Sequence, residues 1–280
     1  MLSKQIYALV FLMGAVAFLY PLVSNMVNRQ AQTHAITRYE EEVAACGLAQ
    51  IEGLRNDAQS YNRFVAGLEG NVTDGLTEEE QSTTDVVYMS VLSTGEAIGY
   101  VKIPKIDVEL PIYRGTSDAV LSRGVGHLER SSLPVGGTDT HTVLVGHRGL
   151  PTSRLFRDLG LLQVGDVFLV NSLGTTLAYE VESTTTVLPS DVSSLQVQEG
   201  RDLCTLVTCD PYMVNSHRLL VTGHRVDYAP SFETAAAEQG HFFQRYWEYF
   251  MVIGAFMLLV AALALLRWRI KRQAFPGGRG

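Results

Sequence analysis

A cysteine at the predicted exit of a strand is the residue best suited to nucleophilic chemistry in this sequence. Cys209 follows an apolar and β-branched run, LCTLVT at 203–208, and precedes the polar stretch DPY. A thiol at such a strand end can meet a substrate at a loop while the sheet holds it still. Two other roles stay open for Cys209, a small buried hydrophobic side chain or one half of a structural disulfide.

The other two cysteines have patterns that favour structural roles. Cys204 lies five residues before Cys209, an odd offset that places the two on opposite faces of a strand, so we do not expect them to pair. Cys46 lies on a helical apolar stripe and is expected in the core. Three cysteines are also too few for a disulfide scaffold and lack the spacing of a zinc site.

A nucleophilic thiol needs a group that accepts its proton, and His147 is the strongest candidate. It also ends an apolar run, TVLVG at 142–146, so two strand ends could bring imidazole and thiol to one end of a barrel. Arg218 begins the strand after the Cys209 loop, and a hairpin would bring it alongside Cys209. There it could stabilise an oxyanion or form a salt bridge at the rim.

The remaining histidines have weaker contexts. We interpret His127 as a structural residue of a loop, and His141, His217 and His224 as satisfied surface or edge residues. His34 and His241 lie outside the β-rich region.

The hydropathy pattern predicts the elements that position these residues. After Gly95, apolar and polar residues alternate at 106–112, which is typical of a half-buried strand, and β-rich runs occupy 98–103, 142–146, 167–170, 177–187, 203–209 and 218–226. Seven or so strands over about 130 residues predict an antiparallel barrel or sandwich. Before Gly95, steps of three and four between apolar residues at 36–68 predict an amphipathic helix with a break near Gly47 or Gly53. Thr77 and Glu80 fit the capping box of another short helix.

Two apolar segments predict a membrane protein. Residues 6–23 and 249–266 are each 18 residues without a charge, so each helix would be about 27 Å long, close to the ~30 Å hydrocarbon core. Basic residues follow the second segment, and Lys4 precedes the first, so both termini are expected in the cytoplasm and the middle of the chain outside it. The alternative for the first segment is a cleaved signal peptide, because Ala15 and Ala17 resemble a cleavage site.

Composition and charge exclude two classes of protein. Of the 280 residues, 46% are hydrophobic, 9% aromatic and 18% charged, which is too apolar and aromatic for a disordered chain. The net charge of −7 argues against nucleic-acid binding, which needs a basic face. Residues 28–245 carry 16 basic and 28 acidic residues, so the predicted exterior part has a net charge of −12.

The motifs around these residues resemble those of a known family. TLVTC at 205–209, with Arg218 nine residues later, resembles the sortase signature. Class C, pilus-assembling sortases are similar at five further stretches, IGYVKIPKI at 98–106, GVGHLE at 124–129, SLPVGG at 132–137, HRGLP at 147–151 and NSHRLLV at 215–221.

The resemblance implies a mainly β fold, an eight-stranded sortase barrel with N-terminal helices, flanked by the two transmembrane helices. It implies a cysteine transpeptidase on the surface of a Gram-positive bacterium, with no metal or organic cofactor. Cys209 would attack the Thr–Gly carbonyl of an LPXTG-type sorting signal, His147 would act as general acid and base, and Arg218 would hold the substrate or its oxyanion. The implied partners are LPXTG-type surface proteins and pilin subunits, whose lysine amine would accept the acyl group.

The apolar segments and the resemblance together predict five parts of the chain. They are an N-terminal anchor at 1–27, a helical extracellular region at 28–94, the catalytic barrel at 95–228, a juxtamembrane linker at 229–245, and a transmembrane helix with a basic tail at 246–280. The class usually carries an Asp-Pro-aromatic lid before the barrel, but here no proline occurs between Pro21 and Pro104. Asp74 and Leu76 are the nearest substitute for a lid anchor, with a plain flexible loop as the alternative. A second departure is Gly146, where an alanine is common.

Three other functions stay open. A cell-wall-anchoring sortase would form the same thioacyl enzyme but use a peptidoglycan amine. A non-catalytic surface β-domain would have a buried, inert Cys209. A surface cysteine hydrolase would release its product without any amine.

Overall fold

The structure is a computed structural model that describes residues 2–68, 72, 88, 90–92, 95–150, 153–234, 254 and 257. The chain divides into two compact units, Met1–Ala236 and Ala237–Gly280, and every element with assigned bounds lies in the first. The predicted capping box at Thr77 and Glu80, and the apolar segment 249–266 apart from two residues, lie outside the described residues. In the part of the chain that is described, no helix is both long enough and apolar enough to cross a membrane.

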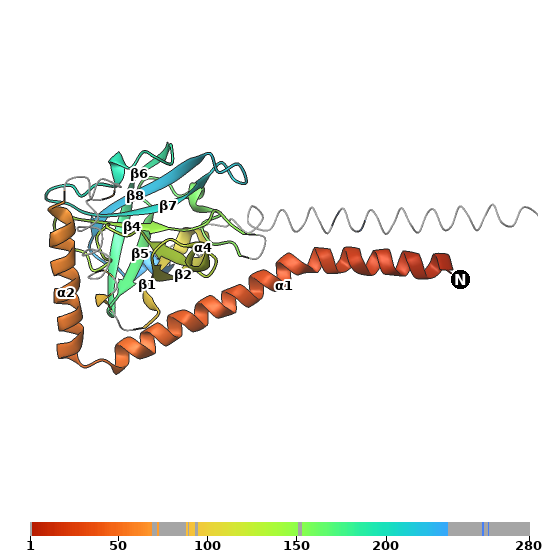
Figure 1. Ribbon diagram of the computed structural model, residues 1–280, viewed down its shortest axis with the longest axis horizontal. Coiled ribbons are helices and arrows are strands. Elements are labelled where there is room, and N and C mark those ends of the chain that lie inside the picture. Colours follow the sequence, from red (N-terminus) through yellow and green to blue (C-terminus); the bar gives the residue numbers. More distant parts are fainter. Residues whose placement is uncertain are drawn as a thin grey trace, which may run out of the picture. The chain divides into compact units, whose positions relative to one another are not determined.

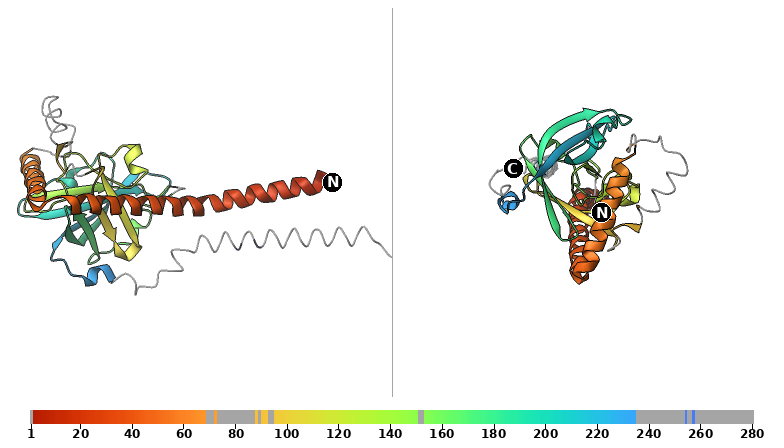
Figure 2. Two further views of the ribbon diagram at one scale, coloured as in Figure 1. Left: turned by 90° about the horizontal axis from the view of Figure 1, so that it is seen from below. Right: turned by 90° about the vertical axis from the view of Figure 1, so that its left-hand side faces the viewer.

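Two long helices precede the barrel (Figure 1), α1 (Leu2–Ala45) and α2 (Leu48–Ala66). They are separated at Gly47, whose extended backbone (φ −70°, ψ 156°) ends one helix and begins the next, whereas Gly53 lies inside α2. One face of α2 is buried at steps of three and four residues, as the sequence predicts, by Ala58, Tyr61, Asn62 and Val65. The C-terminal part of α1 runs beside β1 and β2 (Figure 2).

Eight strands form the body of the first unit. They are β1 (Ala97–Ile103), β2 (Val108–Arg114), β3 (Val125–His127), β4 (Thr140–Val145), β5 (Val167–Ser172), β6 (Thr175–Val187), β7 (Asp202–Asp210) and β8 (His217–Val226). Short helical segments connect or follow them: η1 (Pro104–Ile106), α4 (Asp118–Leu121), η2 (Leu159–Leu161), η3 (Ser193–Leu195) and α5 (Ser231–Thr234).

The strands close into a mixed barrel in the order β1-β2-β3-β4-β7-β8-β6-β5, and β5 returns to β1. Six pairs are antiparallel, but β2 pairs with β3 and β4 pairs with β7 in parallel. The prediction of an antiparallel barrel or sandwich is therefore wrong in strand direction. Parallel partners need a long connection, and the 56 positions between β4 and β7 supply it with β5, β6 and two 3₁₀ turns.

The predicted strand at 106–112 begins later than the alternation suggests. Residues Pro104–Ile106 form the turn η1, and Asp107 follows in the left-handed region at φ 52°. Asp tolerates this conformation, so the chain reverses here and β2 begins at Val108.

The barrel interior is apolar and includes side chains from outside the barrel. Large buried members on the strands and their connections are Ile98, Ile103, Ile112, Leu144, Phe156, Phe168, Tyr179, Leu206 and Val221. Tyr61 and Val65 of α2 join the same cluster, as do Tyr88, Val91 and Leu92. The helical region before the barrel is therefore part of one core with it.

Candidate active site

Cys209 lies at the end of β7, on the outer face of the barrel. Residues alternate along this strand, so Cys204 and Leu206 point into the interior core while Val207 joins a separate apolar cluster outside it. Cys209 shares the side of Val207, is half-buried and is not in a disulfide. Burial raises the pKa of the Cys204 thiol well above its ordinary value, so this cysteine stays protonated and is unsuited to attack a substrate.

Arg218 is the cross-strand partner of Cys209 in the antiparallel pair β7–β8. Its guanidinium donates hydrogen bonds to the backbone carbonyls of Asn215 (3.2 Å) and His217 (3.0 Å). These bonds hold Arg218 against its own hairpin without neutralising its charge. A guanidinium that remains cationic beside the thiol can stabilise negative charge that develops on a substrate oxygen.

His147 leaves the sheet beside Cys209. Strands β4 and β7 are parallel neighbours with Val145 opposite Val207, so His147 and Cys209 each lie two residues beyond this last pair. The His147 carbonyl accepts a hydrogen bond from the Phe156 amide (3.0 Å), which fixes the backbone of the loop after β4. The structure thus brings the two predicted residues to neighbouring strand ends through a connection of more than 60 positions.

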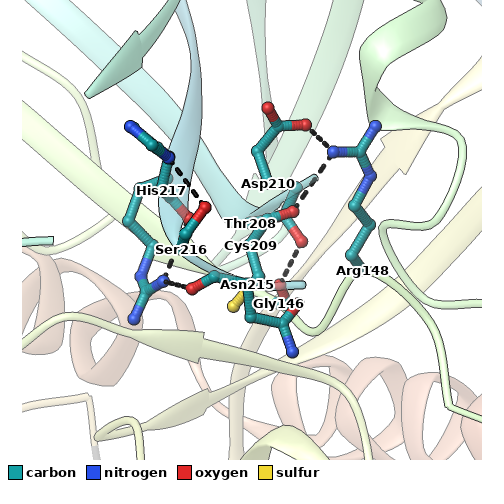
Figure 3. Close-up of polar contacts among 9 residues, drawn as sticks. Gly146, Arg148, Thr208, Cys209, Asp210, Asn215, Ser216 and His217 are labelled. Atoms are coloured by element: carbon teal, nitrogen blue, oxygen red, sulfur yellow. Dashed lines mark hydrogen bonds and ion pairs between the residues drawn. The ribbon is translucent and has the colours of Figure 1, made fainter. Parts of the chain in front are cut away.

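Four contacts join the strand ends beyond the ladder. The Gly146 amide donates to the Val207 carbonyl (2.9 Å), and the Thr208 hydroxyl donates to the Gly146 carbonyl (2.7 Å). Arg148 donates to the Cys209 carbonyl (3.4 Å) and forms an ion pair with Asp210 (Figure 3). Neither Arg148 nor Asp210 is among the site residues that the sequence predicts. The available signal was a pair of opposite charges, each directly after a candidate catalytic residue.

The space around position 146 explains why this chain has glycine where similar sequences commonly have alanine. A β-carbon at this position would lie 2.6 Å from the Phe156 ring, closer than such carbons approach other atoms. Phe156 is fully buried in the barrel core, so the ring has no room to withdraw.

An apolar cluster lies on the same outer face as Cys209. Its buried members are Val143, Leu195, Val207 and Leu220, and half-buried Val72, Leu128, Val145, Val187 and Val192 pack against them. Val72 precedes the predicted lid anchors Asp74 and Leu76, which lie outside the described residues.

His141 is a correction to the sequence analysis, which placed it at the surface or an edge. Its side chain is fully buried. Nδ1 lies 2.9 Å from the Gln196 carbonyl, so it carries the proton, and Nε2 accepts from the Thr205 hydroxyl at 2.7 Å. Burial lowers the pKa of His141, which favours this neutral form. His127 is also buried, in β3 rather than in a loop, and the predicted core residue Cys46 is only half-buried.

Comparison with known proteins agrees with this geometry. A family model described as "Sortase domain" matches residues 101–226. Sortase C1 from Streptococcus agalactiae is 44% identical, with a TM-score of 0.65 over 70% of this chain and 100% of that one. Sortase C of Streptococcus pneumoniae, whose structure addresses pilin substrate specificity, is 43% identical, with a TM-score of 0.61 over 70% and 99%. Sortase C of Clostridium perfringens, solved with the C-terminal cell wall sorting motif, is 36% identical, with a TM-score of 0.60 over 70% and 100%.

The chain therefore belongs to the sortase family of cysteine transpeptidases, and these solved neighbours are class C members. Its alignments span 66% and 42% of the length of two curated sortases, Sortase D of Bacillus subtilis and SrtE1 of Streptomyces coelicolor.

Proposed function

We propose that this protein cleaves an LPXTG-type sorting signal between Thr and Gly and transfers the acyl group to a pilin lysine, which polymerises pili. The observation that carries the proposal is the placement of Cys209 directly opposite Arg218, with His147 at the neighbouring strand exit. The class C neighbours, one of them solved with a sorting motif, support this substrate. The apolar cluster beside Cys209 offers a surface suited to the leucine of such a signal.

In the first half-reaction the Cys209 sulfur, whose proton has passed to His147, attacks the threonine carbonyl carbon, and the negative charge moves to the carbonyl oxygen. Arg218 stabilises this oxyanion. When the oxyanion collapses, the C–N bond to glycine breaks and His147 donates a proton to the departing amine, which leaves a thioester on Cys209.

In the second half-reaction the amine of a pilin lysine attacks the thioester. His147 accepts the proton that this amine loses, and the thiolate of Cys209 departs with formation of an isopeptide bond. His147 thus returns to its starting state after each cycle, so no external oxidant or cofactor is required.

We also propose that segments 6–23 and 249–266 anchor the protein in the cell membrane, with the barrel outside and both termini in the cytoplasm. The absence of charge in both segments and the basic residues after the second support this topology. The five-part division given by the sequence belongs to the same proposal, with the barrel at 95–228. The proposal also includes Asp74 and Leu76 as lid anchors. It is supported by Val72, two residues before Asp74, which packs on the apolar cluster beside Cys209.

The first test is trapping of the acyl enzyme. The full chain in detergent is incubated with an LPXTG peptide and its intact mass is measured. We expect an adduct with the mass of the peptide through threonine in wild type and in Cys46→Ala, which removes the other half-buried thiol, but none in Cys209→Ala. Absence of the adduct in wild type would favour a non-catalytic β-domain.

The second test identifies the acceptor. The acyl enzyme is offered a pilin lysine peptide, a peptidoglycan-type amine or water alone. Preferred transfer to the pilin lysine supports the pilus role, whereas preference for the peptidoglycan amine would assign the chain to cell-wall anchoring. Rapid release to water with no amine product would indicate a hydrolase.

A further inference from the structure

Arg148 and Asp210 form an ion pair between the two strand exits that carry His147 and Cys209. Arg148 directly follows His147, and Asp210 directly follows Cys209. The side chains are 20% and 24% exposed, so the pair is mostly shielded from water. Figure 3 shows the Arg148 guanidinium reaching across to the end of β7.

The pair lies at the point where the backbone ladder stops. Regular pairing of β4 with β7 ends at Val145 and Val207, and one further backbone hydrogen bond joins Gly146 to Val207. Beyond it, side chains provide the contacts, first Thr208 to the Gly146 carbonyl and then Arg148 to the Cys209 carbonyl and the Asp210 carboxylate. These side-chain contacts therefore hold the two segments next to each other beyond the last backbone pair, where His147 and Cys209 lie.

Both contacts of Arg148 are made with Cys209 and Asp210, the last two residues of β7. Both contacts use Nη1, and Nη2 faces Gly160, where a β-carbon would lie 3.5 Å away. The guanidinium is thus enclosed by Asp210, the Cys209 carbonyl and the turn η2, and its charge is balanced. This differs from Arg218, which binds only carbonyls of its own hairpin.

We propose that Arg148 and Asp210 are positioning residues that set the separation of the His147 imidazole and the Cys209 thiol. The inference rests on the proposed function, because it assigns catalytic roles to those two groups. Proton transfer and nucleophilic attack depend steeply on geometry, and a displacement of about 1 Å costs on the order of 100-fold in rate. An ion pair between the adjacent residues restrains both strand exits at once.

The test compares charge removal at this pair with the same change at a matched pair. Asp210→Asn keeps the shape of the side chain and removes its charge, and Asp210→Glu keeps the charge. The control is Asp166→Asn, which breaks an ion pair of similar exposure with Lys105 (2.6 Å; 16% and 21% exposed). In the full chain we measure the single-turnover rate of acylation by an LPXTG peptide, its concentration dependence and the melting temperature.

We expect Asp210→Asn to lower the acylation rate constant 10- to 100-fold with less than a threefold change in apparent peptide affinity. Asp210→Glu should recover part of the loss, and Arg148→Gln should lose at least as much as Asp210→Asn, because it removes the same ion pair together with the bond to the Cys209 carbonyl. Asp166→Asn should leave the rate within twofold of wild type. Equal rates for Asp210→Asn and Asp166→Asn would overturn the inference.

A second readout separates this inference from the proposed function. The rate of Cys209 alkylation by iodoacetamide at pH 7, followed by peptide mapping, requires no peptide substrate. We expect His147→Ala and Asp210→Asn each to slow alkylation at least fivefold, and Asp166→Asn to leave it unchanged. If the wild-type protein forms no acyl enzyme, the proposed function is wrong. If Asp210→Asn is alkylated at the wild-type rate, the positioning role is wrong, whether or not the wild-type protein forms an acyl enzyme.

Discussion

At the residue scale, two arginines near Cys209 have different electrostatic surroundings. Arg148 is balanced by Asp210, while Arg218 donates to the neutral carbonyls of Asn215 and His217. Hydrogen bonds to carbonyls orient a guanidinium but do not cancel its charge. We therefore expect Arg218, rather than Arg148, to stabilise a substrate oxyanion.

Replacement of Arg218 tests this assignment. A lysine keeps the charge but loses the planar fork of donors, so Arg218→Lys should lower kcat/KM for acylation by about 100-fold. The control is Arg225→Lys on the same strand, where the guanidinium lies 5.8 Å from the centre of the Tyr179 ring. Steady-state kinetics with an LPXTG peptide provide the measurement, and an Arg218→Lys rate within threefold of wild type would contradict the oxyanion role.

His127 shows how one buried side chain makes stability depend on pH. Nδ1 accepts from the Tyr88 hydroxyl (3.0 Å) and Nε2 donates to the Ser132 carbonyl (2.9 Å), so the ring is held in its neutral form. Complete burial lowers the pKa of His127 to about 4. Since the unfolded chain has a histidine pKa near 6.5, it binds more protons than the folded chain between these values. Stability from this group is fully present above pH 6.5 and is lost as the pH falls toward 4.

The predicted size of this effect is about 3 kcal/mol when the pH reaches the folded pKa. His127→Gln lacks the titrating ring, so its melting temperature should fall less than that of wild type between pH 6.5 and 4.5. Carboxylates that titrate in the same range are common to both proteins and cancel in the comparison. If the melting temperatures of the two proteins fall equally between pH 6.5 and 4.5, His127 is not the source of the pH dependence.

At the element scale, β4, β7 and β8 present one continuous outer face to the connection between β6 and β7. Thr205 and Thr222 are opposite each other and 2.9 Å apart between hydroxyl oxygens. Because His141 donates to the Gln196 carbonyl, its other nitrogen accepts from Thr205, and Thr205 in turn accepts from Thr222. This chain of hydrogen bonds ties the β6–β7 connection to three strands.

Thr205→Val tests the chain of hydrogen bonds without a large change in shape. Loss of the hydroxyl leaves the buried His141 nitrogen and the Thr222 hydroxyl without their partner, which should lower the free energy of unfolding by about 1–3 kcal/mol. Thr184→Val, at an exposed position of β6, is the control and should change it by less than about 0.5 kcal/mol. Urea unfolding followed by circular dichroism measures both, and equal effects would mean that the bonds contribute nothing.

At the scale of the whole first unit, the barrel and the region before it share one core. Tyr61 and Val65 of α2, together with Leu92, pack with barrel residues and are at most 2% exposed. Asn62 adds two hydrogen bonds with the backbone of Leu133, one in each direction (3.1 and 2.7 Å). Removal of the helical region would therefore expose apolar surface that the barrel strands cannot cover themselves.

This predicts different behaviour for two truncated chains. A fragment of residues 95–228 loses its α2 and Tyr88–Leu92 partners and should lack a cooperative unfolding transition, whereas residues 28–234 should retain one. Differential scanning calorimetry of both fragments provides the comparison. Cooperative unfolding of 95–228 near the temperature of the longer fragment would show that the helical region is dispensable for the core.

The sequence determined the features that depend on neighbouring residues. Alternation and β-branched runs located seven of the eight strands, and the break at Gly47 separated the two helices. The strand end at Cys209 and the start of the next strand at Arg218 predicted a hairpin, and the structure pairs these two residues. The strand β3 was missed, because three residues that include Gly126 are too few to show a period.

Only the tertiary structure decided which strands are neighbours. The parallel pair β4–β7, which brings His147 beside Cys209, joins segments with two other strands between them. Strand pairing is stabilised by partners far apart in sequence, and local periodicity carries no information about them. For the same reason the burial of His141 and the ion pair of Arg148 with Asp210 could not be predicted, since each depends on which segment covers or faces the side chain after the barrel closes.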